Sequence, residues 1–406
     1  MEPLKPEVMI RQVEGLAGDL RALTRPFAQQ IRTVLTPLEW MAVKKVYLTG
    51  DGDSYHASCA AEMAFEAIAD VTCEPMSAQR FLDYGAAWMR HAAPHQTLVV
   101  ATSASGGTKR VVQAIERAKE HGALTIALTG TPNSAVTQVA DRTIVVELPQ
   151  KERSPGIRTY QASLLGMLLV AIQLGAMRNT YPQDEANVLR QELAALADVV
   201  DATTDAIKGR CREVADMIAA TSTLVMVGSG PSYGTALFSA AKVVEAAGIF
   251  ALGQDLEEWW HVERFAYPVD MPVFVIAPPG RSHWRAGDLA ATARALGRRV
   301  IAVTHKDDTE VTRHAHSVLP VQGEVREEFS PLLYHLFASY VASYIAARLG
   351  RSLFQGDRPE LLQSVNEYYA SLQQEEGFTT TKKETTMEKD NEQLPSGGRN
   401  RARSNP

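Results

Sequence analysis

One short motif occurs twice in this chain and limits the possible folds more than any other feature. Gly50-Asp-Gly-Asp-Ser54-Tyr55 returns 178 residues later as Gly228-Ser-Gly-Pro-Ser232-Tyr233, and each copy follows a short apolar run. A second pair of similar segments begins at Gly122 and Gly297, 175 residues apart, and reads GALTIALT and GRRVIAVT. A repeat of this length indicates two duplicated domains rather than a solenoid of short units.

Each copy alternates short apolar runs with Ala-rich segments of helical period. This alternation predicts βαβ units around a parallel sheet, and such sheets bind ligands beyond the carboxyl ends of their strands. We expect strands near 46–49, 97–102, 124–128 and 143–148 in the first copy and near 223–227, 273–277, 299–303 and 318–321 in the second. We expect helices over 55–69, 107–120, 159–177, 233–247, 286–296 and 331–349.

The remaining segments surround these two copies. We expect a helical lead-in over 1–40, a first domain over 41–180, a linker helix over 181–222, a second domain over 223–350, a helical tail over 351–373 and a disordered tail over 374–406. The last segment is polar, charged and nearly free of large apolar side chains, so burial cannot offset the entropy lost on ordering it.

The composition narrows the class of protein. Apolar residues make up 45% of the chain and charged residues 22%, as in ordinary globular proteins. The net charge of −6, without a long basic stripe, argues against a nucleic-acid partner. We find no export signal and no run of about 20 apolar residues, so we expect a cytoplasmic protein that binds no membrane. Three cysteines without metal-ligand spacing, Cys59, Cys73 and Cys211, are expected to be reduced packing residues.

Two polar turns end predicted strands of the first copy, at Gly50-Asp-Gly-Asp-Ser54 and at Thr102-Ser-Ala-Ser-Gly-Gly-Thr108. Small residues allow close approach of the backbone to an anion, and hydroxyls and helix-start N–H groups donate hydrogen bonds to it. The alternative is that these hydroxyls merely cap the helices that follow. The second copy has Pro278-Pro-Gly-Arg-Ser-His283 instead, where two prolines lack N–H donors, so we expect no phosphate site there.

The second copy carries possible proton-transfer groups. Lys242 and Glu245 are three residues apart in a helical run and therefore share one face. They form either an exposed ion pair or, where Glu245 is partly buried among Ala and Val, a base suited to removing a proton beside a carbonyl. His261 lies in a segment rich in aromatic and acidic residues, and a structural role is its alternative.

Together these motifs resemble the double sugar-isomerase (SIS) domain family, typified by the isomerase half of glucosamine-6-phosphate synthase and by fructoselysine-6-phosphate deglycase. The family turn CGTS followed by YHA is similar to Asp51-Gly-Asp-Ser-Tyr-His-Ala57, and its second turn SQSGET to Ser103-Ala-Ser-Gly-Gly-Thr108. The resemblance spans residues 8 to about 365. It implies an α/β fold of two tandem SIS domains, each a parallel five-stranded sheet flanked by helices.

The resemblance also implies roles for single residues. The phosphate contacts carried over are Gly52, Ser54, Ser103, Ala104, Ser105 and Thr108, with Ala104 contributing only its backbone. The family helix ALKLKE matches Ala240-Ala-Lys-Val-Val-Glu245, and its Glu moves a proton between C1 and C2. The family histidine, which assists ring opening, follows sixteen residues later, as His261 does here. Catalytic roles for Glu245, His261 and Lys242 are implied, without a metal or cofactor. Because the family places that histidine across a subunit boundary, a homodimer is also implied.

Three departures from the synthase bear on the substrate. No glutaminase domain with a cysteine nucleophile is present, so we do not expect glutamine-dependent amination. The family pattern GELKHGP is replaced by Glu257-Glu-Trp-Trp-His-Val-Glu263. The stretch 360–365 lacks the lysine that closes over the sugar in the synthase. Stand-alone members with such an altered pocket look more like the deglycases.

The sequence therefore predicts an enzyme that cleaves a 1-amino-1-deoxy-ketose 6-phosphate, an Amadori-type compound, into an amine and an aldose 6-phosphate. The acids Asp255, Glu257, Glu258 and Glu263 either receive the cationic amine of the substrate or form a solvated helix face. Isomerisation or deamination of an amino-sugar phosphate is an alternative, because it uses the same enolising base. A non-catalytic phosphosugar-sensing regulator is the alternative outside the enzymes.

Overall fold

The computed structural model describes residues 3–91, 95–150, 152–360 and 363–364. Met1–Phe354 form one unit and Gln355–Pro406 form a second. The predicted tail 374–406 lies outside the described residues, and so do residues 361, 362 and 365–373 of the predicted helical tail 351–373.

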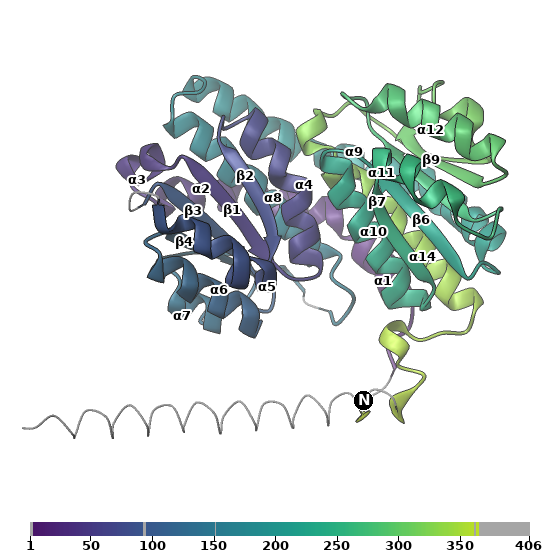
Figure 1. Ribbon diagram of the computed structural model, residues 1–406, viewed down its shortest axis with the longest axis horizontal. Coiled ribbons are helices and arrows are strands. Elements are labelled where there is room, and N and C mark those ends of the chain that lie inside the picture. The colour runs from purple at the N-terminus through teal and green to yellow at the C-terminus, as the bar shows by residue number, and fades with distance from the viewer. Residues whose placement is uncertain (1–2, 92–94, 151, 361–362, 365–406) are drawn as a thin grey trace, which may run out of the picture. The chain divides into compact units, whose positions relative to one another are not determined.

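Each half of the first unit contains a five-stranded parallel sheet, and the strand order is the same in both (Figure 1). The first sheet has the order β2 (Thr72–Ser77), β1 (Lys45–Gly50), β3 (Thr97–Thr102), β4 (Leu124–Thr129), β5 (Arg142–Val145). The second has β7 (Phe250–Asp255), β6 (Thr223–Gly228), β8 (Pro272–Ala277), β9 (Arg299–His305), β10 (Ser317–Val321). Every neighbouring pair is parallel. The α/β fold class of two such sheets is confirmed.

The eight strands expected from the sequence are present, but β2 and β7 were not located in advance. Both are edge strands, since each pairs only with the first strand of its own sheet. Their residues, TCEPMS and FALGQD, are largely half-buried and lack the continuous apolar run of a central strand. Pro75 is tolerated in β2 because an edge strand has a side that needs no ladder hydrogen bond.

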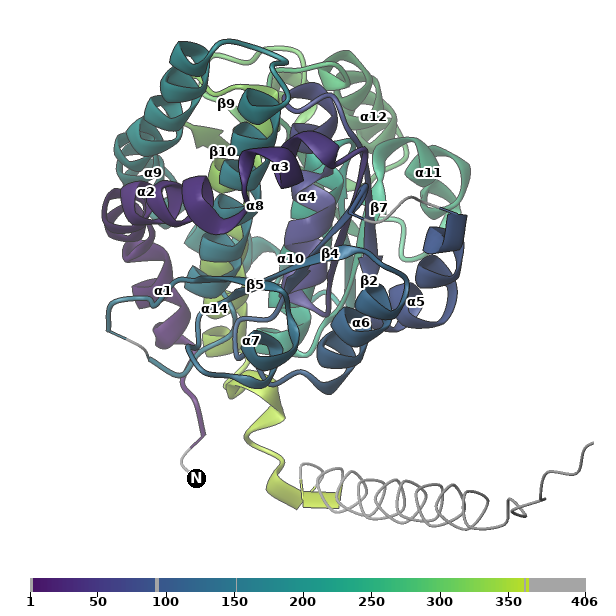
Figure 2. The ribbon, with the colours of Figure 1, turned by 90° about the vertical axis from the view of Figure 1, so that its left-hand side faces the viewer.

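Helices lie on both faces of each sheet (Figures 1 and 2). The first half contains α1 (Glu7–Glu14), α2 (Leu16–Val34), α3 (Pro37–Ala42), α4 (Asp53–Ala67), α5 (Ala78–Arg80), α6 (Lys109–Glu120), α7 (Ala135–Val139) and α8 (Arg158–Met177). The 36-residue α9 (Gln183–Ile218) is the predicted linker helix. The second half contains α10 (Pro231–Ala247), α11 (Leu256–His261), α12 (His283–Ala295), α13 (Pro331–Tyr334) and α14 (Leu336–Arg348).

The largest hydrophobic cluster lies between the two sheets and joins the halves. It contains side chains of α4 and α8 together with those of α10 and α14. Two smaller clusters cover the outer faces, one under α6 and the other under α11 and α12. All three cysteines are free and buried, as predicted. Contrary to the expectation that no such run occurs, α8 is long and apolar enough to cross a membrane by length and composition, but most of it is buried within the protein.

The two halves meet most closely where α4 packs on α10 (Figure 2). A Cβ atom added at Gly234 of α10 would lie 2.3 Å from the backbone nitrogen of Ala60 on α4. Only hydrogen fits between these two backbones. This close approach sets the distance between the first turn of α4 and the last turns of α10.

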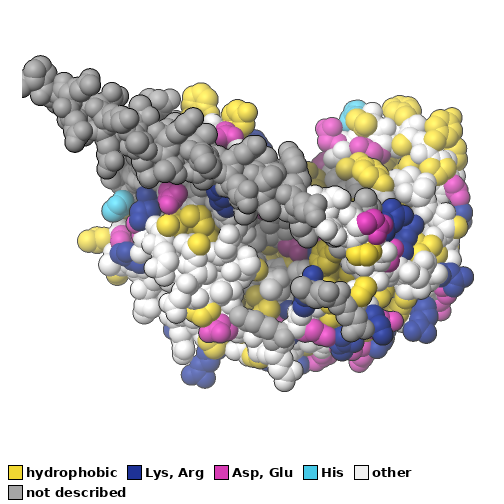
Figure 3. Space-filling view, turned by 90° about the horizontal axis from the view of Figure 1, so that it is seen from below, with side chains coloured by type: hydrophobic (Ala, Val, Ile, Leu, Met, Phe, Trp, Pro, Cys, Tyr) yellow, Lys and Arg dark blue, Asp and Glu magenta, His cyan; other side chains and the backbone are white. Residues whose placement is uncertain are grey.

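The surface seen in Figure 3 carries charges of both signs among uncharged and hydrophobic side chains. On the uncovered part of that face, lysine and arginine side chains do not merge into one basic surface.

Gly234→Ala is expected to destabilise the protein by about 1–3 kcal/mol, because the new methyl group overpacks a backbone contact. Gly209→Ala is the matched control: Gly209 lies on α9 with nothing within 4 Å of the added Cβ, and alanine should stabilise this helix by about 1 kcal/mol. Urea unfolding of both variants measures the difference. Equal free energies of unfolding for the two variants would contradict the close contact.

Candidate functional site

Two turns face each other where β1 and β3 end. These strands are neighbours, and the chain leaves them toward opposite edges of the sheet, which is the position where doubly wound sheets bind ligands. A Cβ atom at Gly50 would lie 2.8 Å from the carbonyl oxygen of Thr102, so glycine allows the turns to approach. Gly52 has φ 54° and ψ −125°, a backbone conformation that strongly favours glycine, and it directly precedes α4. Gly230 repeats this conformation before α10.

A polar cavity of about 240 Å³ lies between the two turns. Its lining includes five of the six predicted phosphate contacts: Ser54, Ser103, Ala104, Ser105 and Thr108. The sixth, Gly52, shapes the turn as described above. The structure therefore brings the two predicted turns into one site.

The hydroxyl groups of these turns do not cap helices in the described structure. Thr108 occupies the N-cap position of α6, but its side chain accepts no cap hydrogen bond, and the N-cap of α4 is Gly52. The Thr108 Oγ1 atom instead lies 3.0 Å from the Ser103 Oγ, which also accepts a hydrogen bond from the Gly106 N–H. The capping alternative is thus not supported for these turns.

A larger cavity of about 310 Å³ adjoins the polar one and shares Ala104, Ser105, Thr159 and Ser163 with it. Much of its remaining lining is aliphatic or aromatic, including Phe27, Leu128, Val146 and Leu148. The smaller cavity offers hydroxyl groups that can replace the water around an anion. Two carboxylates also line it, and each has a partner: Asp51 accepts from the Ala78 N–H, and Asp53 contacts Lys242. The smaller cavity is therefore the candidate phosphate site.

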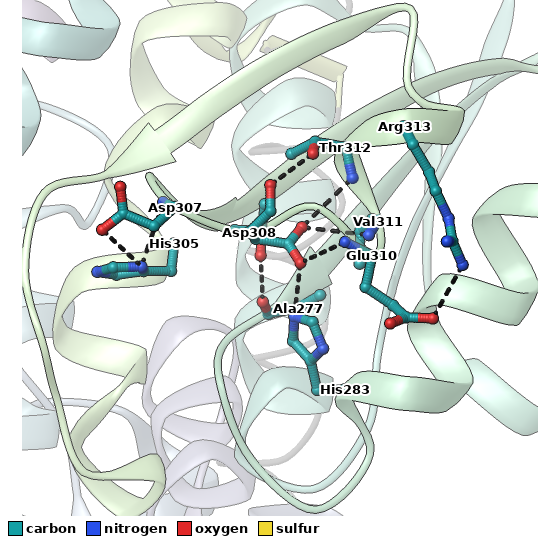
Figure 4. Close-up of polar contacts among 10 residues, drawn as sticks. Ala277, His283, His305, Asp307, Asp308, Glu310, Val311, Thr312 and Arg313 are labelled. Carbon is teal, nitrogen blue, oxygen red and sulfur yellow. Dashed lines mark hydrogen bonds and ion pairs between the residues drawn. The ribbon is translucent and has the colours of Figure 1, made fainter.

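The equivalent turn of the second copy is occupied by a side chain of the protein itself. The Glu327 carboxylate accepts a hydrogen bond from the Arg281 N–H (3.1 Å), and a Cβ at Gly280 would lie 2.4 Å from it. Close by, the buried Asp308 carboxylate accepts from three N–H groups of residues 310–312 and lies 3.3 Å from His283 (Figure 4). Internal carboxylates thus use the donors that an external anion would need.

Lys242 and Glu245 do not form an exposed ion pair, because Lys242 is buried and also contacts Asp53 of the other half. The Lys242 side chain is 0% exposed, and its Nζ atom lies 2.6 Å from Glu245 Oε2 and 2.7 Å from Asp53 Oδ2 of α4. Burial and the charge of Asp53 raise the pKa of Glu245, whereas Lys242 opposes this rise. Burial alone would raise the pKa of Asp53, but Lys242 and His56 outweigh it and hold that pKa below its usual value. Asp53 also lines the polar cavity, so it connects the phosphate end with Glu245.

His261 lies elsewhere on the chain. Its side chain on α11 is 69% exposed and lies 3.4 Å from Glu257. No hydrogen bond or ion pair joins it to Glu245 within the described residues. One chain by itself therefore does not unite the predicted base and the predicted histidine.

Three of the four acids near His261 already have partners in the protein. Asp255 accepts from the Ser229 hydroxyl, Glu257 forms two hydrogen bonds with Arg285, and Glu263 accepts from Gln254. Glu258 is exposed. The Glu263 Oε2 atom has no hydrogen-bond partner in the described structure. Binding of a cationic amine by this group of acids stays a prediction.

Sequence reasoning did not find the wall of the site contributed by residues 156–163. Gly156, Thr159, Tyr160 and Ser163 line the polar cavity from the start of α8, far along the chain from both turns and without a recognisable motif. The sequence marks Asp53 only as part of the turn 50–54. Its replacement of the family threonine was the available signal.

Two segments of the chain, residues 41–172 and 217–349, match the SIS domain, and together they make up more than half of its length. The chain belongs to the SIS domain family. The resemblance inferred from the motifs is confirmed. This SIS protein is 27% identical over 354 residues to the isomerizing glutamine–fructose-6-phosphate aminotransferase of Gloeobacter violaceus, covering 86% of this chain and 56% of that protein. It spans about half the length of the curated relatives it matches.

Solved structures share the fold of this SIS protein. The C-terminal domain of glucosamine-fructose-6-phosphate aminotransferase from Francisella tularensis aligns with a TM-score of 0.73 at 15% identity, covering 86% of this chain and 97% of that one. Tagatose-6-phosphate ketose/aldose isomerase from Escherichia coli aligns with a TM-score of 0.69 at 16% identity, covering 87% and 97%. At these identities the likeness shows the fold alone.

Ser103→Ala is expected to weaken binding of inorganic phosphate roughly 10- to 100-fold, the loss typical of one hydrogen bond to a charged group. Ser282→Ala, in the equivalent turn of the second copy, is the matched control and should leave the affinity unchanged. Isothermal titration calorimetry measures both variants and should give one phosphate per chain. If Ser282→Ala loses more phosphate affinity than Ser103→Ala, the phosphate binds in the second copy and the prediction is wrong.

Proposed function

We propose that this SIS protein cleaves a 1-amino-1-deoxy-ketose 6-phosphate into an amine and an aldose 6-phosphate. The observation that supports this most is the continuity of one site: a polar cavity suited to phosphate is lined by Asp53, which contacts Lys242, which contacts Glu245. An anion-binding end and a carboxylate base, here the half-buried Glu245, are the two groups that enolisation of a sugar phosphate requires.

In the proposed mechanism the hydroxyl and N–H groups of residues 54 and 103–108 hold the phosphate and thereby position the sugar chain. His261 assists opening of the sugar ring. Glu245 removes a proton from C1 of the ketosamine and forms an enaminol. Reprotonation at C2 gives an imine, which water hydrolyses to the free amine and the aldose 6-phosphate. The Lys242 ammonium group lies 2.6 Å from Glu245 and stabilises its charged form.

Isomerisation or deamination of an amino-sugar phosphate is the second candidate. The names of the related proteins, which include an isomerizing aminotransferase and a ketose/aldose isomerase, favour it. Both candidates use Glu245 to move a proton between C1 and C2. Deglycation releases an amine from C1, whereas isomerisation releases no nitrogen and deamination releases ammonia from C2.

We also propose that the active form is a homodimer in which His261 completes the site of the partner subunit. Within one chain His261 is exposed and has no described contact with Glu245. The surface around it exposes large apolar side chains at Val262, Phe265, Tyr267 and Trp284. A second copy of the chain covering this surface accounts for both features. The three free, buried cysteines are consistent with the reducing conditions of the cytoplasm, where we propose the dimer works.

Glu245→Gln is expected to lower kcat by at least about 100-fold, because it removes a general base. Purified protein is mixed with fructosamine 6-phosphates and, separately, with glucosamine 6-phosphate, and products are followed by mass spectrometry. Glu213→Gln, an exposed position on α9, is the control and should keep full activity. Full activity of Glu245→Gln, or binding without turnover of either substrate class, would reject the enzymatic assignment.

Mixing two inactive variants tests the shared site. Glu245→Gln and His261→Ala homodimers each lack one group in both sites, whereas a mixed dimer has one site with both groups intact. Subunit exchange between equal amounts is expected to restore about a quarter of wild-type activity by statistics. Mass spectrometry verifies that subunits have exchanged. If activity does not recover after that, both residues act within one chain.

A further inference from the structure

A single buried lysine is shared by two carboxylates in this protein. Lys242 is 0% exposed, and its ammonium group lies 2.7 Å from Asp53 and 2.6 Å from Glu245. The two carboxylates come from different halves of the unit, Asp53 from the first turn of α4 and Glu245 from the last turn of α10. The ammonium charge that would stabilise ionised Glu245 is therefore divided between two partners.

The charged groups around Glu245 come from two helices. Lys242 is on its own helix, and Asp53 and His56 are on α4. Tyr160 of α8 faces Asp53. The Asp53 Oδ1 atom lies 3.8 Å from His56 Nδ1, and neither atom has a hydrogen-bond partner in the described structure. Lys242 and His56 favour the ionised form of Glu245, and Asp53 disfavours it.

This arrangement exists once, although the helices that hold it are duplicated. The repeat offset of 178 places Pro231 opposite Asp53, and it places Ala64 and Ala67 opposite Lys242 and Glu245. The other end of the α4 and α10 pair therefore lacks both the acid and the lysine. The charged cluster is not a requirement of packing these two helices together, because the equivalent end packs without it.

The segment around Gly156 leaves room for the Asp53 side chain. A Cβ atom added at Gly156 would lie 2.3 Å from the Asp53 Oδ2 atom, the same oxygen that contacts Lys242. The synthase turn CGTS has threonine where this chain has Asp53, and a threonine side chain carries no charge to set against the lysine. The aspartate is thus accommodated by the backbone around it and differs from the family pattern.

We propose that Asp53 is a positioning residue that shares the charge of the Lys242 ammonium group with Glu245, so that Glu245 remains basic enough to remove the C1 proton. This inference rests on the proposed function, because it takes Glu245 as the base. Asp53 acts through Lys242 and does not itself transfer a proton. Its removal gives Glu245 the whole charge of Lys242 and makes it a weaker base.

The test follows the titration of Glu245 directly by NMR of the full chain carrying ¹³C-labelled glutamate side chains, without substrate. The Glu245 resonance is assigned by its loss in Glu245→Gln. Asp53→Asn, which keeps the shape of the side chain, is expected to lower the Glu245 titration midpoint by about one pH unit or more. Asp53→Thr, the synthase residue, should act in the same direction. Lys242→Met should raise the midpoint, and if this variant does not fold, the two Asp53 variants carry the test.

Asp51→Asn is the matched control, since Asp51 lies in the same turn and accepts a hydrogen bond from the Ala78 N–H rather than from Lys242. It should leave the Glu245 midpoint within about 0.3 pH unit. An unchanged midpoint in Asp53→Asn, or equal shifts in the two Asn variants, would overturn the inference.

The acid limb of the kcat profile provides a second readout. Glu245 acts as a base only when ionised, so activity is lost as the pH falls through its pKa, and Asp53→Asn should move this limb to lower pH and reduce the plateau. If the wild-type protein turns over no sugar phosphate, the proposed function fails while the NMR titration still decides the role of Asp53. If sugar phosphate is turned over but the acid limb does not move in Asp53→Asn, the proposed role of Asp53 is wrong and the proposed function stands.

Discussion

The burial of the Lys242 ammonium group between the two halves is the constraint on which the site depends. Lys242 is fully buried and lies within hydrogen-bond distance of Asp53 and Glu245. A buried charge of this kind is strongly destabilising unless its partners are held in place. They are held by the packing of α4 on α10, where Gly234 lets two helix backbones approach closely. The same contact that joins the halves therefore places Glu245, the proposed base, close to the polar cavity proposed to bind phosphate.

Duplication supplied two similar domains, and the structure shows how they became different. The turns of the first copy line an open polar cavity with Ser54, Ser103 and Thr108. In the second copy the Glu327 carboxylate occupies the equivalent turn and Asp308 uses the N–H groups of the next loop. An internal anion is always present at high local concentration, so it excludes an external one. We therefore propose that the first copy binds phosphate and that α10 of the second supplies the base.

Much of the fold and part of the site could be predicted from the sequence. The repeated motif and the apolar runs located eight of ten strands, because central parallel strands are buried on both faces and read as continuous apolar segments. The edge strands β2 and β7 could not be predicted, since half-buried strands mix polar and apolar residues. Ser103 and Thr108 were found because a glycine-rich turn after a strand has a recognisable pattern.

What the sequence could not supply were relations between distant residues. Spacing put Lys242 and Glu245 on one face of a helix, but their burial depends on α4, which lies about 180 residues earlier in the chain. Asp53, Gly156 and Glu327 have roles that depend only on tertiary contacts. His261 has its expected spacing, yet the structure of one chain leaves it exposed.

The central claim is that this protein removes a proton from C1 of a phosphorylated ketosamine, and the fate of deuterium tests it most directly. Substrate carrying two deuterium atoms at C1 is incubated with the protein, and the product is examined by NMR and mass spectrometry. The account predicts an aldose 6-phosphate that keeps one deuterium at C1, because the other leaves that carbon during enaminol formation. A ketose 6-phosphate that keeps both deuterium atoms at C1 would show direct displacement of the amine by water and would contradict the account.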